Sequence, residues 1–214
     1  MSGSDETLNK QYLLSVLVEK DADPDPFKQF DVWYNVALNS GLIFPNAFTL
    51  ATSTTGGSPS ARVLLLKGVE EKGFVFYTNR ESRKGNELDD NPNAAMCFWW
   101  DKLERQVRIE GRVYLVSGEE ADTYFHSRPE GSRIGAWASD QSRVIGSREE
   151  LESKYREYEQ EYKDIEIPRP QYWVGYRLIP TLFEFWQGRD NRLHDRLEYK
   201  LSEDGMWVIE RLAP

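Results

Sequence analysis

Basic side chains lie inside or directly beside short apolar segments of this 214-residue chain. Three groups share the pattern: Arg62 and Lys67 around Val63, Leu64, Leu65 and Leu66; Arg83 and Lys84 after Tyr77 and Thr78; and Arg105 and Arg108 around Val107. Binding a phosphate takes several charge-assisted hydrogen bonds of about 1.5–3 kcal/mol each, which two or three Lys or Arg side chains supply. In a chain of net charge −9, cations so placed favour an anionic ligand, and they suffice for two phosphates. The alternative is a row of edge-strand charges that reach water and discourage aggregation.

A second group of donors surrounds a Pro-Glu-Gly sequence that we interpret as a turn. It contains Tyr124, His126, Arg128, Ser132 and Arg133. The planar fork of an Arg side chain matches a phosphate, and Tyr and Ser add hydroxyl donors. Donors of these types around one loop suit a phosphate monoester.

A third group follows the apolar segment that ends at Trp186. Arg192, His194 and Arg196 alternate along the chain, so an extended backbone would place all three on one face. Three such groups on one face without partners are costly, which favours a ligand. The alternative is a solvated turn in which the two Arg side chains pair with carboxylates at positions 190, 195 and 198.

The composition argues against several classes of protein. An excess of 36 Asp and Glu over 27 Lys and Arg argues against nucleic-acid binding. The longest apolar run, residues 94–100, is far shorter than the ~18 residues of a spanning helix, so no membrane contact is predicted. A single Cys97 and two His indicate neither a disulfide framework nor a metal site. A hydrolase with a Ser nucleophile and a His base is not predicted, because neither His lies beside a Ser flanked by Gly. With no signal-peptide pattern, the chain is predicted to be cytoplasmic.

Periodicity predicts the elements that must position these groups. Asp25 followed by Pro26 is typical of a helix start, and apolar residues then recur at helical spacing until Gly41. The pair Ser147 and Glu150 indicates a capping box ahead of a charged helix through position 163. The segments with strand character are 48–53, 61–67, 74–78, 94–100, 106–116, 172–179, 182–186, 197–201 and 207–211.

These segments predict a mainly β fold, a largely antiparallel barrel with peripheral helices. Residues 24–214 are predicted to form a single domain of ordinary size. Residues 1–23 lack a clear periodic face and form a separate N-terminal segment, for which mobility is one interpretation.

Nine stretches, distributed from about residue 24 to the end, carry a resemblance to one family. They are 62–67 (RVLLLK), 76–79 (FYTN), 82–84 (SRK), 104–107 (ERQV), 124–129 (YFHSRP), 134–139 (IGAWAS), 185–188 (FWQG), 192–196 (RLHDR) and 211–214 (RLAP). With them, the chain resembles the pyridoxine (pyridoxamine) 5′-phosphate oxidases, FMN enzymes that make pyridoxal 5′-phosphate. Because the matches are spread along the sequence, chance similarity of one motif does not explain them.

The resemblance implies an FMN-binding split barrel that acts as a homodimer, with the flavin between the subunits. The family's FMN-binding positions fall on Arg62, Val63, Leu64, Leu65, Leu66, Lys67, Tyr77, Thr78, Arg83, Lys84, Gln106, Gln141, Ser142, Trp186 and Arg196. Its substrate-binding positions fall on Lys67, Tyr124, Arg128, Ser132, Arg192, Leu193 and His194, with Arg192 and His194 as the catalytic pair. The family's N-terminal lid is matched around positions 10–12 only by the Tyr and one cation.

The implied reaction converts pyridoxine 5′-phosphate or pyridoxamine 5′-phosphate to pyridoxal 5′-phosphate, with hydride transfer to the flavin and reoxidation by molecular oxygen to hydrogen peroxide. Two rival functions stay open. A split-barrel oxidase with another substrate would lack the set Tyr124, Arg128, Arg192 and His194, all of which are present. A non-catalytic protein that binds flavin or pyridoxal phosphate would keep the site and not turn over.

Overall fold

The structure, a computed structural model, describes residues 16–70 and 73–214. Its helices are α1 (Pro26–Leu38), α2 (Arg83–Asp90), α3 (Gly118–Ser127), α4 (Glu130–Ala138) and α5 (Arg148–Glu161). Its strands are β1 (Ala47–Ser53), β2 (Pro59–Leu65), β3 (Gly68–Glu70), β4 (Gly73–Asn79), β5 (Asn93–Trp100), β6 (Arg105–Leu115), β7 (Trp173–Gln187), β8 (Asp195–Leu201) and β9 (Trp207–Arg211). Short 3-10 turns occupy Glu19–Asp21, Asp101–Leu103 and Asp190–Arg192.

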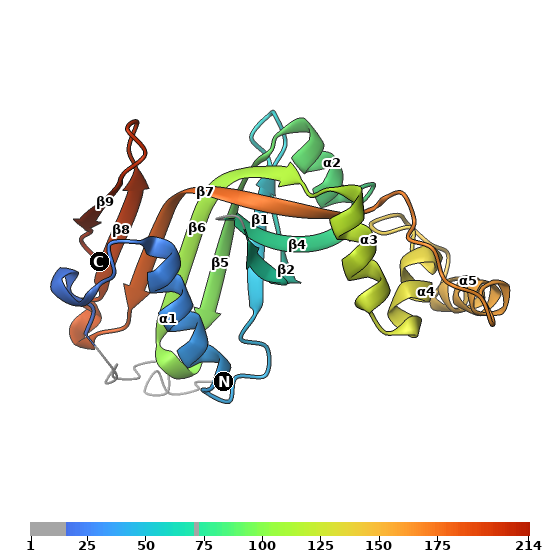
Figure 1. Cartoon of the computed structure of the whole chain (residues 1–214), viewed down its shortest axis with the longest axis horizontal. Helices are drawn as coiled ribbons and strands as arrows, with labels where there is room; N and C mark the ends of the chain where they lie inside the picture. The colour runs from blue at the N-terminus through green and yellow to red at the C-terminus, as the bar shows by residue number, and fades with distance from the viewer. Residues whose placement is uncertain (1–15, 71–72) are drawn as a thin grey trace, which may run out of the picture.

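Within the described residues the strands form one curved, antiparallel, nine-stranded sheet. The order is β2-β1-β5-β6-β7-β4-β3, and β8 and β9 extend from β7. Figure 1 shows α1 lying across one face of the sheet, with α3, α4 and α5 gathered at one end and β8 and β9 at the other. This arrangement confirms the predicted mainly β split barrel with peripheral helices.

The main core lies between α1 and the sheet. Asp25 caps α1, because its side chain accepts a hydrogen bond from the backbone N–H of Phe27 at 2.9 Å, as the Asp-Pro sequence predicted. One face of the helix then buries Phe30 and Trp33, whose rings pack edge-on against Phe74 and Phe185. The aromatic residues of this helix therefore fix it on the barrel.

Strand β7 is longer than predicted. The sequence predicts two strands, 172–179 and 182–186, but the structure has one, from Trp173 to Gln187. Its register against β6 shifts between Glu110 and Gly111, which accommodates Pro180 without a broken strand. A Cβ at Gly111 would lie 2.1 Å from the Ile179 carbonyl oxygen, so only glycine fits there. One strand thus connects both ends of the molecule.

The structure contains three helices and one short strand that were not predicted: α2, α3, α4 and β3. The Pro-Glu-Gly sequence interpreted as a turn is in fact the junction of two helices, since Pro129 is the N-cap of α4 and Glu130 and Gly131 lie in its first turn. These helices, with α5, enclose a second apolar cluster built on Phe125, Ile134, Ile167 and Trp173. Their apolar faces are short, which is why periodicity alone missed them.

The helix predicted from position 147 is confirmed. Ser147 caps α5 by accepting from the N–H of Glu150 at 3.3 Å, and the Glu150 carboxylate accepts from the N–H of Gly146 at 2.8 Å. The reciprocal bond therefore lies one residue earlier than in the usual capping box.

Part of the predicted N-terminal segment packs on the C-terminal strands. Leu17 is buried, and its N–H donates to Asp195 at 3.1 Å. Arg211 donates to the Leu17 carbonyl and pairs with Glu19 at 2.7 Å. Residues 1–15, with the partly matched lid positions 10–12, lie outside the described residues. In the described part of the chain, no helix is long and apolar enough to cross a membrane.

Candidate functional site

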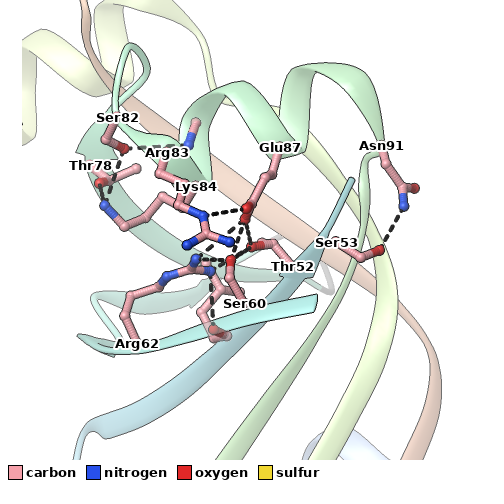
Figure 2. Close-up of polar contacts among 12 residues, drawn as sticks. Thr52, Ser53, Ser60, Arg62, Thr78, Ser82, Arg83, Lys84, Glu87 and Asn91 are labelled. Carbon is pink, nitrogen blue, oxygen red and sulfur yellow. Dashed lines mark hydrogen bonds and ion pairs between the residues drawn. The ribbon is translucent and has the colours of Figure 1, made fainter. Parts of the chain in front are cut away.

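A cluster of cations surrounds one buried carboxylate where α2 meets β1 and β2. The N-cap Ser82 places Arg83 and Lys84 in the first turn of α2, and Glu87 follows one helical turn later, only 5% exposed. Glu87 Oε1 pairs with Arg83 Nε at 2.9 Å, and Glu87 Oε2 pairs with Arg62 Nη2 at 3.3 Å. Figure 2 shows these side chains converging with Thr52 and Ser60.

The hydroxyls of Thr52 and Ser60 each donate to Glu87 Oε2 at 2.5 Å. The hydroxyl oxygens of Thr52 and Ser60 in turn accept hydrogen bonds from the Arg62 guanidinium. Burial alone raises the pKa of Glu87, but the hydrogen bonds from Ser60, Thr52 and Arg83 and the charge of Arg62 outweigh it and lower the pKa to about 2. Glu87 is therefore ionised and holds both Arg side chains.

Lys84 is a buried cation whose hydrogen-bond acceptors are all neutral. Its Nζ donates to Gln141 Oε1 at 2.7 Å, Ser82 Oγ at 3.1 Å and Thr78 Oγ1 at 3.3 Å. Burial, followed by the nearby charge of Arg62, lowers the pKa of Lys84 to about 8. Gln141 belongs to the loop after α4, and Ser142 beside it has a left-handed backbone with φ of 72°. The structure thus brings five of the predicted FMN-binding residues together: Arg62, Thr78, Arg83, Lys84 and Gln141.

A pocket of about 570 Å³ opens next to this cluster, between β2, β4, α3 and α4. Its lining includes Lys67, Tyr124, Arg128 and Ser132, which are four of the predicted substrate-binding residues. Leu64, Tyr77, Thr78 and Gln141 of the predicted FMN set also line it. Its lining residues include no Asp or Glu. The pocket is therefore suited to a phosphorylated ligand.

The remaining predicted FMN positions of this segment lie on β2 or, for Leu66, directly after it, and they differ in exposure. Val63 and Leu65 face outward, 66% and 36% exposed, whereas Leu66 is buried. Arg62 and Leu64 share the opposite face, with Ser60.

A second group of predicted site residues lies where β6, β7 and β8 run together. Trp186 on β7 pairs in register with Gln106 on β6 and with Arg196 on β8. The His194 ring lies 4.5 Å from the Trp186 ring, and His194 Nδ1 accepts from the backbone N–H of Arg189 at 3.1 Å. Burial, with a contribution from the charge of Arg192, lowers the pKa of His194. A neutral imidazole is therefore expected near pH 7.

The predicted alternation of Arg192, His194 and Arg196 on one face is wrong. Residues Asp190–Arg192 form a turn in which Asn191 and Arg192 have φ values of 56° and 60°, so the backbone is not extended there. The alternative, in which Arg196 pairs with a carboxylate at position 190, 195 or 198, is also wrong. Arg196 pairs with Glu184 at 2.9 Å and donates to the Ala213 carbonyl. Arg192 and Leu193 stay exposed.

Four other basic residues from the sequence patterns lie elsewhere. The Arg105 guanidinium covers the Trp33 ring at 4.3 Å, and Arg108 pairs with Glu184 at 2.9 Å. His126 lies 3.3 Å from Glu166, and Arg133 lines a separate pocket with Glu130 and Glu159. These four residues lie near a ring or carboxylates of the fold, and the structure does not place them with the proposed anion-binding groups.

The two groups of site residues lie at opposite ends of β7. Trp173, its first residue, lines the pocket, whereas Trp186, near its last residue, contacts His194. Thirteen residues of extended chain correspond to about 40 Å along the strand. Figure 1 shows the strand running from α3 at one end to β8 at the other. One chain therefore does not bring the two groups into a single site.

Two residues of this region were missed from the sequence. Glu87 lies four residues after Arg83, a spacing that predicts an ion pair once a helix is assumed. Trp173 contacts both Tyr77 and Arg128. Nothing in the sequence distinguishes it from the other six Trp residues.

Comparison with known proteins identifies the family of this chain. A family profile described as "Pyridoxamine 5'-phosphate oxidase" matches residues 37–162, and one described as "Pyridoxine 5'-phosphate oxidase C-terminal dimerisation region" matches residues 173–214. The chain is 56% identical to the pyridoxine/pyridoxamine 5′-phosphate oxidase of Gloeothece citriformis over 214 residues, and 56% identical to that of Bordetella petrii, with all of each chain covered.

Solved structures share the fold. The chain is similar to PhzG from Burkholderia lata 383, crystallised with tetrahydrophenazine-1-carboxylic acid, with a TM-score of 0.88 and 30% identity over 94% of this chain and 99% of the other. A pyridoxamine 5′-phosphate oxidase-related, FMN-binding protein from Nostoc punctiforme has a TM-score of 0.71 at 18% identity, over 90% of this chain and all of the other. Full-length identity above half, together with both family profiles, shows that this chain belongs to the pyridoxine/pyridoxamine 5′-phosphate oxidase family.

Proposed function

We propose that the two groups of site residues, one from each of two chains, form the active site for this family's reaction. As a family member, the chain is an FMN-dependent oxidase of pyridoxine 5′-phosphate and pyridoxamine 5′-phosphate. The proposal concerns which residues bind each phosphate and how the site is completed. The observation that carries it is the pocket of two cations and several hydroxyls with no acidic lining residue.

The cluster around Glu87 fits the phosphate of FMN. Three cations, Arg62, Arg83 and Lys84, surround one carboxylate, so the cluster has a net charge of about +2, which a phosphate dianion balances. Lys84 gains most from such an anion, because its present hydrogen-bond acceptors are all neutral. The donor set, with Thr78 and Gln141 beside it, is therefore suited to hold the cofactor.

The pocket residues fit the phosphate of the substrate. Lys67 and Arg128 supply two positive charges, and Tyr124 and Ser132 supply hydroxyl donors. Arg128 Nη1 is buried and has no hydrogen-bond partner among residues 16–70 and 73–214, so it has a donor left for a ligand oxygen. Binding the phosphate here fixes one end of the substrate and leaves its ring to be oriented by other groups.

Arg192 and His194 are proposed to orient the substrate ring and its 4′ oxygen or amine. His194 is held by Trp186 and by the backbone of Arg189, so its ring has a fixed orientation. Arg192 is exposed on a left-handed turn beside it. FMN held by the cluster of Arg62, Arg83 and Lys84 would supply the redox chemistry of this oxidation, with oxygen as the final electron acceptor.

A homodimer follows from the distance between the two groups. Since about 40 Å of strand separates them in one chain, a second copy has to present its Arg192 and His194 to the first copy's pocket. The match of residues 173–214 to a dimerisation region supports this arrangement. A cytoplasmic location stays a prediction from the sequence.

The test is an anaerobic reduction assay. Purified protein loaded with FMN should lose its yellow absorbance when pyridoxine 5′-phosphate or pyridoxamine 5′-phosphate is added without oxygen, and regain it on admission of air, with pyridoxal 5′-phosphate as product. Retention of the flavin colour with both substrates would support the non-catalytic rival. Bleaching by another reduced substrate, but by neither vitamer, would support the oxidase with a different substrate.

A further inference from the structure

In the described part of the chain, Arg128 contacts aromatic rings in the pocket and pairs with no carboxylate. Its guanidinium carbon lies 4.8 Å from the centre of the Trp173 ring and 5.6 Å from that of Phe125. Arg62, the corresponding cation of the neighbouring cluster, is instead bound by the carboxylate of Glu87. The two proposed phosphate sites therefore fix their Arg side chains by different means.

Trp173 also belongs to a stack of three rings. Its ring lies 5.1 Å from that of Tyr77 with an interplanar angle of 7°, and Tyr77 lies 4.1 Å from Tyr124 with an angle of 13°. Lys67 Nζ lies 5.7 Å from the centre of the Tyr124 ring on this same stack. Three of the four proposed phosphate ligands, Lys67, Tyr124 and Arg128, thus contact one aromatic assembly.

The pairing of β4 with β7 builds this stack. Tyr77 lies opposite Gly175 in register, and a Cβ on Gly175 would come within 2.6 Å of the Tyr77 ring. Glycine at this position lets the ring lie flat on the strand, next to Trp173 two residues earlier. Trp173 itself is only 7% exposed, so its ring has little freedom to move.

We propose that Trp173 is a positioning residue for the substrate phosphate: its ring holds Arg128 by a cation–π contact and, through Tyr77, fixes Tyr124. The inference rests on the proposed function of the pocket. A cation–π contact attracts the guanidinium and adds no negative charge. A carboxylate would hold Arg128 as well, but it would repel the phosphate and cancel one of the two positive charges of the pocket. The aromatic ring leaves both charges to the ligand.

The test measures steady-state kinetics of Trp173→Phe and Trp173→Leu with pyridoxamine 5′-phosphate. We expect KM to rise about threefold for Phe and about tenfold for Leu, with kcat at saturation and FMN content nearly unchanged, because uniform binding is lost. The preference for pyridoxamine 5′-phosphate over unphosphorylated pyridoxamine should fall by the same factors. Inorganic phosphate, used as a competitive inhibitor, should bind more weakly in the same order.

Two controls separate positioning from stability. Trp137 lies in the same apolar cluster, away from the pocket lining, and donates to the Pro168 carbonyl at 2.8 Å. Trp137→Phe should lower the melting temperature and leave KM unchanged. In an Arg128→Ala background, Trp173→Phe should raise KM by a clearly smaller factor, since the cation–π contact is already gone and only the effect through Tyr77 and Tyr124 is left.

The outcomes distinguish this inference from the proposed function. If the wild-type protein does not oxidise pyridoxamine 5′-phosphate, the proposed function fails. If it does, and Trp173→Phe lowers only the melting temperature, or raises KM by the same factor with and without Arg128, Trp173 is merely structural and the inference is overturned. Trp173→Phe keeps a packed ring, so the test does not depend on Trp173→Leu folding.

Discussion

Glu87 lies 3.3 Å from Arg62 across the junction of α2 and β2, and it is the one carboxylate among the cations of the proposed FMN phosphate cluster. Its side chain is 5% exposed and accepts hydrogen bonds from two hydroxyls besides the two Arg side chains. Removing it would leave two guanidinium groups close together without a counter-ion.

We expect Glu87→Gln to lower the free energy of unfolding of the FMN-free protein by about 3 kcal/mol at pH 7, because breaking a buried pair leaves uncompensated charge. Because folding lowers the pKa of Glu87 from 4.5 to about 2, its stabilising effect is complete above pH 4.5 and is lost as the pH falls toward 2. The difference between the two proteins should therefore shrink over that range. Chemical unfolding at fixed protein concentration measures it.

The matched control is Asp89→Asn on the same helix. Asp89 pairs with Arg80 at 2.9 Å, but both side chains are more than a third exposed, so the change should stay within about 0.5 kcal/mol. Equal losses for the two variants would contradict the role given to Glu87.

The lowered pKa of Lys84 leads us to expect that FMN binding depends on pH. Burial and the charge of Arg62 lower the pKa of Lys84 to about 8, so the ammonium that would bind the phosphate is lost as the pH rises through that value. FMN affinity, measured by quenching of flavin fluorescence, should be highest below pH 7 and fall between pH 7 and 9. Lys84→Met should bind FMN about tenfold more weakly and lose this dependence. A flat wild-type profile up to pH 9, or the same slope in the variant, would refute the assignment.

Substitutions of Arg192 should affect activity far more than stability. Arg192→Ala should lower kcat/KM by roughly ten- to a hundredfold, because one charge-assisted hydrogen bond to the substrate is lost. FMN content and melting temperature should stay unchanged. Arg192→Gly should lose as much activity and melt slightly higher, because a left-handed φ of 60° costs other residues about 1 kcal/mol or more. A lower melting temperature with normal kinetics would instead assign Arg192 to bracing the turn. His194→Ala should impair substrate binding less than Arg192→Ala, since imidazole has fewer donors.

The pKa of His194 should rise when Arg192 is replaced. Burial lowers the pKa of His194, and the charge of Arg192 lowers it further. The pKa of His194 should accordingly be higher in Arg192→Ala than in the wild-type protein, as measured from imidazole proton resonances. His126 is the other histidine of the chain and gives a reference resonance in the same spectrum. An unchanged pKa would show that the two side chains do not interact.

Mixed dimers test whether two chains share the site. Arg128→Ala and Arg192→Ala should each keep at most about a tenth of the wild-type kcat/KM. Unfolding and refolding them together should restore about a quarter of wild-type activity, because half of the dimers then hold one intact site. Sites contained in a single chain would give no recovery. Sedimentation of the separate variants should show the same dimer as the wild type.

The sequence was sufficient for the fold class, for helices α1 and α5 and for most strands, because Asp25, Ser147 and the alternating apolar residues are local signals. It also indicated the anionic ligand, since cations beside apolar segments in an acidic chain need a counter-charge. It did not predict α2, α3 and α4, whose apolar faces are completed only by residues far away in the chain, such as Trp173 against Phe125. Nor did it separate the Arg side chains of the pocket and cluster from Arg105 and Arg108, which the fold directs to Trp33 and Glu184.

Only the tertiary structure decided how each cation is held and which residues can meet. Arg62 is bound by a carboxylate and Arg128 by a ring, although the sequence predicted an anionic ligand for both, because β2 faces α2 whereas α3 faces the start of β7. The left-handed turn at Asn191 and Arg192 broke the alternation that the spacing predicted. The length of β7 separated the two groups of proposed site residues, and a separation set by strand pairing is not encoded in any local run of residues.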